Sequence, residues 1–170
     1  TTDHGYLLGE HDWWGKNLAP VYEELSHVPL FIHHPNHAAA QGTKRKSLTQ
    51  VTDLMPTILN WHGIEIPEEV TGHLLEPVLA NDETIRDFAI FGYFASAVNI
   101  TDGEYIYMRY PEDLTADGVF EYTLMPTSFG SRFATDLLAR AELAEPMEFT
   151  KGCPVLKVPA PARDLSLIHI

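Results

Sequence analysis

The sequence is poor in cysteine, in basic residues and in long apolar runs, and each scarcity excludes something. The single cysteine, Cys153, cannot form an internal disulfide or a cysteine-based metal site, so we interpret it as a small apolar residue. The formal net charge of −13 argues against nucleic acid or an anionic membrane surface as a partner. No apolar run reaches the roughly 20 residues that a membrane-spanning helix needs.

What remains is an ordinary globular composition. Hydrophobic residues make up 45% of the chain and charged residues 21%, which is typical of a soluble globular domain. A chain of 170 residues is long enough to bury a core of its own. The chemistry must therefore be sought in local patterns of side chains rather than in bulk composition.

Residues 1–16 hold the side chains that ask for a chemical explanation. Asp3 and His4 are adjacent metal-ligating types, and neighbours on a regular strand point to opposite faces. At the end of a strand they can converge, and Gly5 permits the necessary turn. A cation held by this pair, with the ammonium of Lys16 nearby, would form a site for an oxyanion. The alternative for the tripeptide alone is a polar turn without chemistry.

The wider pattern favours the first interpretation. The segments are DHGYLLGEHDWWGK at residues 3–16, YEE at 22–24 and HVPL at 27–30. Their order and spacing resemble the sulfatase family of the alkaline-phosphatase-like superfamily over roughly the first seventy-five residues. The resemblance implies that Asp3 and His4 bind a divalent cation and that Lys16 is a catalytic residue that contacts the sulfate. His11 is a second candidate for contact with the substrate, with a structural hydrogen-bonding role as its alternative.

The resemblance also implies cofactors and a substrate class. The cation is expected to be Ca²⁺, although an imidazole ligand makes Mn²⁺ an alternative. The nucleophile of the family is a formylglycine made from a Cys/Ser-x-Pro-x-Arg motif, and this sequence does not contain that motif. We therefore expect the chain to be a C-terminal fragment that is inactive alone, with the nucleophile on a missing N-terminal part. The expected substrate is a small-molecule or saccharide sulfate ester.

Several questions stay open at this stage. A phosphodiester or phosphonate monoester hydrolase of the same superfamily, and a non-catalytic module, are the alternative functions. The pattern does not decide between a cytoplasmic and a periplasmic location, and it does not indicate an oligomeric state. Residues 165–170 resemble a translated sequencing adapter, so we interpret them as a non-native tail and exclude them from the fold.

The first half of the chain is expected to be the C-terminal part of an alkaline-phosphatase-like α/β sandwich, over residues 1–85. Residues 3–17 are predicted to be a loop, residues 18–26 a helix and residues 28–33 a strand buried in a parallel sheet. Residues 52–63 are predicted to be a helix that begins at a capping Thr52 or Asp53, contains Pro56 in its first turn and ends at Gly63. On this interpretation Asp53 is a cap and not a catalytic acid.

The second half, residues 86–164, is expected to be a small subdomain with an antiparallel sheet and a packed helix. The composition changes near residue 86, after a short helix and connector over residues 77–87. Strands are predicted at residues 88–94, 97–100 and 105–110, with Asp-Gly at the turn between the last two, and a further strand at 120–124. Residues 131–145 are predicted to be an amphipathic helix, followed by a proline-rich extended tail.

One more group of histidines needs an interpretation. His33, His34 and His37 lie close together in the segment HHPNH, and imidazole is a common metal ligand. No acidic residue or cysteine in the segment completes a coordination shell. A surface loop is therefore favoured over a metal site.

Overall fold

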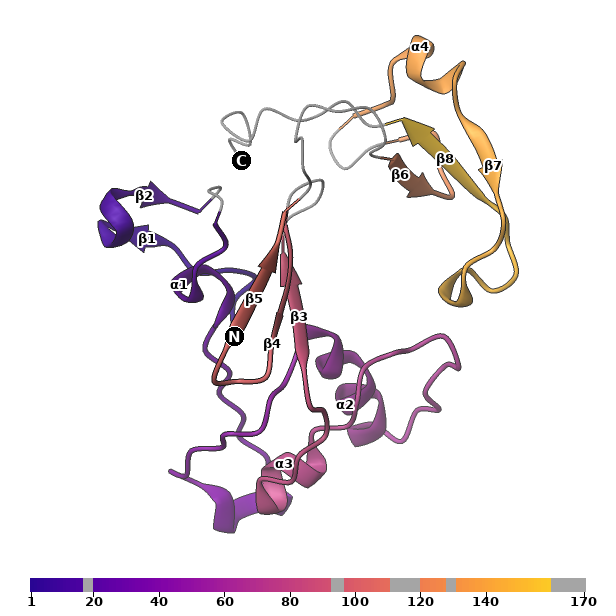
Figure 1. The fold of residues 1–170 in the computed structure, drawn as a ribbon. Coiled ribbons are helices and arrows are strands. Elements are labelled where there is room, and N and C mark those ends of the chain that lie inside the picture. Colours follow the sequence, from indigo (N-terminus) through magenta and orange to yellow (C-terminus); the bar gives the residue numbers. More distant parts are fainter. Residues whose placement is uncertain (17–19, 93–96, 111–119, 128–130, 160–170) are drawn as a thin grey trace. The chain divides into compact units, whose positions relative to one another are not determined.

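The computed structural model describes residues 1–16, 20–92, 97–110, 120–127 and 131–159 (Figure 1). The chain divides into two compact units, Thr1–Pro111 and Glu112–Ile170. The change of composition near residue 86 coincides with the start of a sheet inside the first unit rather than with this division. Within the described part of the chain, none of the helices has the length and apolar character needed to cross a membrane.

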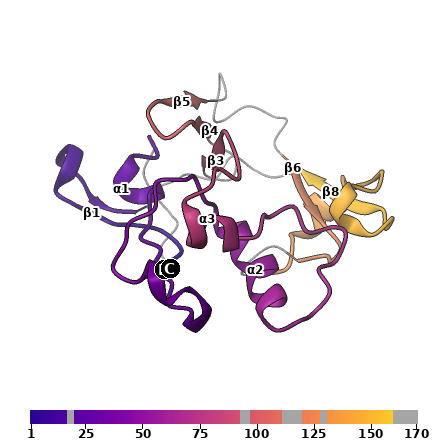
Figure 2. The same ribbon diagram turned by 90° about the horizontal axis from the view of Figure 1, so that it is seen from below.

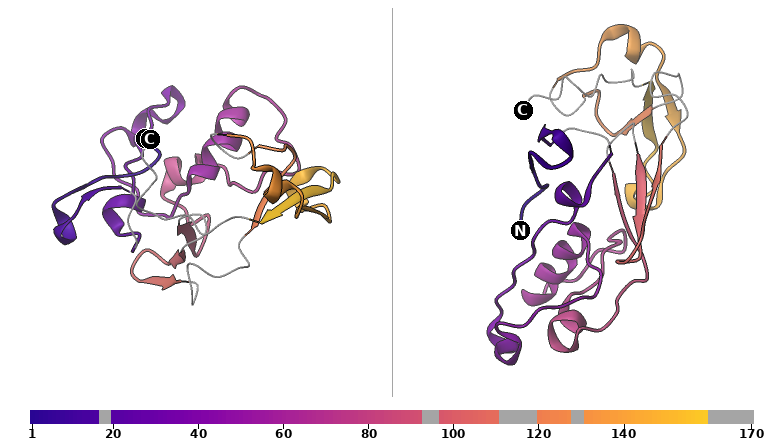
Figure 3. Two further views of the ribbon diagram at one scale, coloured as in Figure 1. Left: turned by 90° about the horizontal axis from the view of Figure 1, so that it is seen from above. Right: turned by 60° about the vertical axis from the view of Figure 1, so that its left-hand side comes forward.

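The described residues of the first unit form a small hairpin, three α-helices and a three-stranded sheet. Its elements are β1 (Leu7–Leu8), β2 (Trp14–Gly15), α1 (Glu23–Ser26), α2 (Leu54–Trp61), α3 (Glu76–Asn81), β3 (Ala89–Gly92), β4 (Val98–Thr101) and β5 (Ile106–Arg109). Short 3-10 turns span Glu10–Asp12, Pro35–Ala40 and Val51–Asp53. Helices α2 and α3 lie side by side (Figure 2, Figure 3), and the backbone N–H of Leu75 donates to the Thr57 hydroxyl between them.

The antiparallel sheet β3–β4–β5 confirms the three strands predicted from the aromatic and β-branched segments. Ile100 in the central strand pairs with Ile90 on one side and Tyr107 on the other. In the turn between β4 and β5, the Asp102 carboxylate accepts hydrogen bonds from two backbone N–H groups. Gly103 takes the left-handed conformation there, with a φ of 93°, which explains the Asp-Gly pair in the sequence.

Helix α2 confirms the predicted helix, although it begins differently. The 3-10 turn Val51–Asp53 leads into it, and the capping residue of that turn is Gln50. The Asp53 carboxylate accepts a hydrogen bond of 2.7 Å from the backbone N–H of Gln50, which is the role of the third residue in a capping box. The predicted N-cap role of Asp53 was therefore wrong, because its side chain makes no capping hydrogen bond to α2. Gly63 follows the helix with a φ of 65°, as a C-terminal glycine should.

Three predictions for the start of the chain need correction. Residues 3–17 hold the β1–β2 hairpin instead of an irregular loop. Of the helix predicted over 18–26, only Glu23–Ser26 is helical, and residues 17–19 lie outside the described part. Residues 28–33 form no strand, because no described segment pairs with them, and Phe31 is 86% exposed. A strand needs a hydrogen-bonded neighbour, so an apolar run alone did not suffice.

The second unit is built on a sheet of order β6–β8–β7. The strands are β6 (Phe120–Thr123), β7 (Glu142–Ala144) and β8 (Val155–Pro159), and both pairings are antiparallel. The strand predicted at 120–124 is therefore present, but it pairs with β8 and not with the sheet of the first unit. The proline-rich segment was wrongly predicted to be only a tail, since Val155 and Val158 are buried in the central strand.

The helix predicted over residues 131–145 is mostly wrong. Only α4 (Thr135–Leu138) is helical, and the last part of the range forms β7. Leu143, in β7, is 79% exposed. Pairing with β8 supplies hydrogen bonds to Glu142–Ala144, and Pro146 disfavours helix in the residue before it. Residues 165–170 lie outside the described part of the chain.

Candidate functional site

Gly5 fixes the Asp3–His4 pair to helix α1. Its backbone N–H donates a hydrogen bond of 2.9 Å to the carbonyl of Leu25. A Cβ atom at this position would lie 1.7 Å from the carbonyl oxygen of Glu24, so only glycine allows this approach. The N-terminal segment is therefore held against α1 at the point where the two candidate metal ligands stand.

A small apolar core supports the same region. Leu7 from β1 packs with Val21 and Leu25, and Tyr22 and Phe91 cover this cluster. Leu7 and Leu25 are almost fully buried, so the hairpin and α1 share one core. The elements on either side of the candidate site thus pack as one piece.

The imidazole of His4 has a defined orientation. Its Nδ1–H donates a hydrogen bond of 2.9 Å to the carbonyl of Gly5, which leaves Nε2 as the atom with a free electron pair. Lys16 Nζ lies 2.8 Å from Nε2 and donates to it, and Asp3 Oδ2 lies 3.3 Å from the same nitrogen. The structure therefore brings together the three side chains singled out in the sequence.

The electrostatics of Asp3 suit a cation ligand. Its own backbone N–H and the Thr2 hydroxyl hold the pKa of Asp3 below its ordinary value, so the carboxylate is ionised at neutral pH. Metal-bound histidines usually donate the other ring N–H to a carbonyl or carboxylate, as His4 does to Gly5. Asp3 and His4 alone are two ligands, and among the described residues no three His, Cys, Asp or Glu side chains are grouped to hold a metal ion.

His11 is placed away from this cluster. It lies in the 3-10 turn at the tip of the hairpin, and its ring stacks on Tyr22 with centroids 3.5 Å apart and planes 7° from parallel. Its Nε2 lies 3.4 Å from Glu24 Oε2. These contacts lead to α1 and not to Lys16, so the predicted contact with a substrate remains a prediction.

Comparison with known protein families identifies relatives of this sequence. Residues 9–103 match the family described as "N-sulphoglucosamine sulphohydrolase, C-terminal". The chain belongs to this family. The match includes His11 and Lys16, and it ends before the second unit of the chain begins. The resemblance to sulfatases that the motifs predicted is thereby confirmed.

This chain is similar to three curated proteins that carry different names. It is 36% identical over 95 residues to the N-acetylglucosamine-6-O-sulfatase of Bacteroides thetaiotaomicron, covering 55% of this chain and 16% of that protein. An arylsulfatase of Clostridium perfringens is 35% identical over 91 residues, covering 51% of this chain and 18% of its own length. The multifunctional alkaline phosphatase superfamily protein PehA of Trinickia caryophylli is 36% identical over 80 residues, covering 47% and 15%.

These similarities cover a limited region. The chain spans about a sixth of the length of these curated relatives. No solved structure matches the chain. The α/β character and the antiparallel sheets fit a C-terminal sulphohydrolase region, whereas the alkaline-phosphatase-like sandwich stays a prediction.

The sequence did not reveal the side chain that pairs with Asp53. The Asp53 side chain is fully buried, and both its oxygens are bonded by the guanidinium of Arg86. It also accepts a hydrogen bond of 2.8 Å from the backbone N–H of His73. Burial raises the pKa of Asp53, but the Arg86 guanidinium and the backbone donors outweigh it and hold this pKa below its ordinary value.

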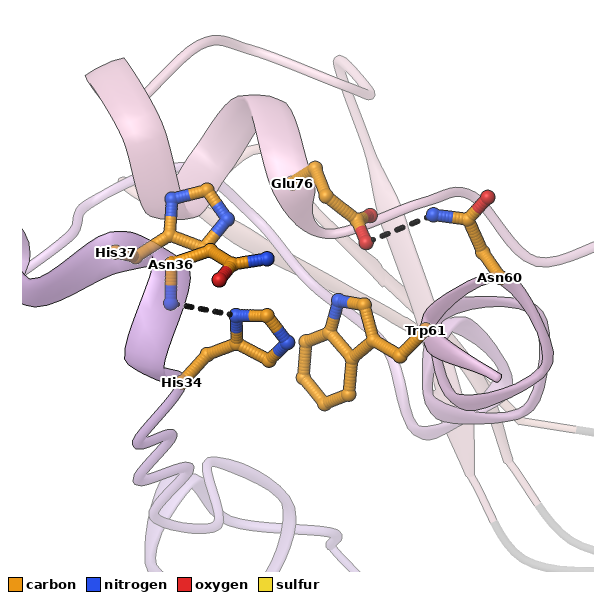
Figure 4. A pocket seen from close by; sticks show the side chains of 6 residues that line it. All are labelled: His34, Asn36, His37, Asn60, Trp61 and Glu76. Atoms are coloured by element: carbon orange, nitrogen blue, oxygen red, sulfur yellow. Dashed lines mark hydrogen bonds between the residues drawn. The ribbon is translucent and has the colours of Figure 1, made fainter. Parts of the chain in front are cut away.

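A cavity lies beside α2 and α3. It has a volume of about 270 Å³, and Figure 4 shows the side chains around it: His34, Asn36, His37, Asn60, Trp61 and Glu76. Asn60 donates a hydrogen bond of 3.0 Å to Glu76 Oε1, and the rings of His34 and Trp61 are 4.7 Å apart. Glu76 adds to this group the acidic residue that the segment HHPNH lacks. Its position beside these histidines was not predicted, because Glu76 lies 39 positions after His37 in the sequence.

Proposed function

We propose that this chain is the C-terminal part of a sulfuric ester hydrolase and that it contributes part of the cation and sulfate site. The convergence of Asp3, His4 and Lys16 is the observation that supports this function most directly. Membership of the sulphohydrolase family, and the sulfatase names of its relatives, support the same reaction class. The substrate would be a small-molecule or saccharide sulfate ester.

Each of the three side chains would have a distinct role. The Asp3 carboxylate and His4 Nε2 would hold a divalent cation, which supplies positive charge to neutralise the sulfate as its ester bond breaks. The family resemblance favours Ca²⁺, and the imidazole favours Mn²⁺. Lys16 would turn its ammonium from His4 Nε2 to a sulfate oxygen. This local positive charge would oppose the repulsion of an anionic ester by the acidic chain.

On this proposal the nucleophile would lie outside these 170 residues. The sequence holds no Cys/Ser-x-Pro-x-Arg motif, from which the formylglycine of the family is made. The 170 residues would then carry only part of the site, and we expect them to be inactive on their own. In the full-length protein, the remaining ligands of the cation would also lie outside this chain.

Hydrolysis of a phosphodiester or phosphonate monoester is the second candidate function. It is favoured by the similarity to PehA, whose name places it in the alkaline phosphatase superfamily and calls it multifunctional. A cation beside an ammonium suits a phosphoryl group as well as a sulfuryl group. The three convergent side chains therefore do not separate these two reactions.

The deciding experiment compares two substrates with the same leaving group. The full-length protein is assayed for kcat/KM on 4-nitrophenyl sulfate and on bis(4-nitrophenyl) phosphate, with its Lys16→Ala variant as control for contaminating hydrolases. We expect the sulfate ester to be preferred. A preference for the phosphodiester would reject the first function in favour of the second. Turnover of neither ester, together with a full-length sequence that lacks the nucleophile motif, would leave a non-catalytic module.

A further inference from the structure

We propose that His11 is a positioning residue that fastens the tip of the β1–β2 hairpin to α1 and thereby sets the place of Lys16 relative to His4. This inference rests on the proposed function, because it concerns the same candidate site. It replaces a direct contact between His11 and the substrate with an indirect role. The backbone, the ring and the imidazole nitrogen of His11 each give an independent reason.

The backbone at the tip is held in an unfavourable conformation. His11 and Asp12 have φ angles of 55° and 61°, in the left-handed region that residues with a Cβ atom rarely adopt. Two such residues in succession persist only where the surrounding contacts enforce them, and such strain is concentrated at functional sites. The strain therefore points to a contact that holds the tip in place.

The side chain of His11 provides that contact. Its ring is stacked face to face on Tyr22, the residue just before α1, and its Nε2 lies 3.4 Å from a carboxylate oxygen of Glu24, the second residue of that helix. One face of the ring and Nε2 are thus already engaged within the protein. An imidazole used in this way is better suited to anchor a loop than to bind an incoming ester.

The anchor acts on Lys16 through the geometry of the hairpin. Leu7 pairs with Gly15 and Leu8 pairs with Trp14, and Lys16 follows directly after β2. At the other end, Gly5 joins the start of the hairpin to α1 through its hydrogen bond to Leu25. The hairpin is therefore attached to α1 at its base and at its tip. Release of the tip would let β2, and with it Lys16, move relative to His4.

A double-mutant cycle in the full-length protein tests this coupling. His11→Ala should lower kcat/KM on the better ester about ten- to a hundredfold, because small misplacements of a catalytic group carry costs of this size. The same substitution in a Lys16→Ala background should cost almost nothing more, since the anchor then has no ammonium to position. Additive losses in the cycle would overturn the proposal, because they would show that His11 acts without Lys16.

Two further variants separate anchoring from a general loss of structure. His11→Phe keeps a flat ring to stack on Tyr22 and should recover most of the activity lost in His11→Ala. His27→Ala removes an exposed imidazole that contacts Glu23 of α1 at 2.7 Å but lies outside the hairpin, so it should leave the rate unchanged. A loss in His27→Ala equal to that in His11→Ala would contradict a specific role for the tip.

A structural measurement decides the anchor independently of activity. Hydrogen–deuterium exchange over residues 7–15 should become faster in His11→Ala than in the wild type and stay near the wild-type rate in His11→Phe. Unchanged exchange in His11→Ala would overturn the proposal even if activity fell. If the wild type hydrolysed neither ester, the proposed function would fail. Faster exchange in His11→Ala would then still show that His11 anchors the hairpin, but without a role in catalysis.

Discussion

The ammonium group of Lys16 lies against His4 Nε2, the atom that would face a cation, and this contact gives the most direct prediction at the scale of single residues. Replacement of Lys16 by Ala in the full-length protein should lower kcat about 10²- to 10³-fold, the loss typical for removal of one group that stabilises a transition-state anion. Steady-state assays with the preferred ester measure it. Lys44→Ala, on an exposed segment, is the matched control. A wild-type rate in Lys16→Ala would remove this residue from the site.

The buried pair of Asp53 and Arg86 gives a second prediction at this scale. Arg86→Gln leaves the Asp53 carboxylate buried with only its backbone donors, so the free energy of unfolding should fall by about 3–5 kcal/mol. Urea unfolding followed by circular dichroism measures the change. Arg109→Gln, on an exposed position of β5, should change stability little. Equal effects of the two substitutions would show that the pair contributes nothing special.

The same pair predicts how stability depends on pH. The pKa of Asp53 is lower in the folded state than the value of about 3.9 expected in the unfolded chain. The stabilisation by the ionised carboxylate is therefore fully present above about pH 4 and is lost as the pH falls through the folded pKa. The difference in unfolding free energy between wild type and Asp53→Asn should be constant from neutral pH to about pH 5 and shrink below pH 4. A difference that grew on acidification would contradict this sign.

At the scale of elements, the close contact between the N-terminal segment and α1 predicts a large effect of a single methyl group. Gly5→Ala places a Cβ atom against the Glu24 carbonyl, so the segment must move away from α1 and take Asp3 and His4 with it. Both the melting temperature and kcat should fall. Gly42→Ala is the control, because nothing lies within 4 Å of its Cβ position and only its φ of 72° is unfavourable. Gly5 does not have a positive φ, so a loss in Gly5→Ala no larger than the strain-related loss in Gly42→Ala would contradict an effect of the contact.

The helices and strands also differ in how well they could be predicted from the sequence. Helix α2 and the strands β3 to β5 were predicted because their signals are local, in a capping turn, a terminal glycine and an Asp-Gly turn. Residues 131–145 were mispredicted because a periodic apolar pattern suits a short helix as well as a strand that pairs with a distant partner. Residues 28–33 were mispredicted for the related reason that a strand exists only beside another strand.

At the scale of the whole molecule, the proposed function predicts a requirement for a divalent cation. Exhaustive treatment of the full-length protein with EDTA should abolish hydrolysis, because the sulfate would lose its main source of positive charge. Addition of Ca²⁺ or of Mn²⁺ should restore it, and the ion that restores more activity identifies the preferred cofactor. Full activity after removal of all bound metal, checked by elemental analysis, would contradict the proposed roles of Asp3 and His4.

The sequence alone indicated the family, through motifs whose residues are close together in the chain. The same motifs singled out Asp3, His4 and Lys16 as site residues. Only the tertiary structure decided that Lys16 reaches His4, that His11 turns away to stack on Tyr22, and that Asp53 pairs with Arg86. The physical reason is the separation of the residues along the chain. Caps, turns and motifs depend on neighbouring residues, so a sequence pattern can predict them. These three contacts join positions between 11 and 33 residues apart, and whether such positions meet depends on how the whole unit packs.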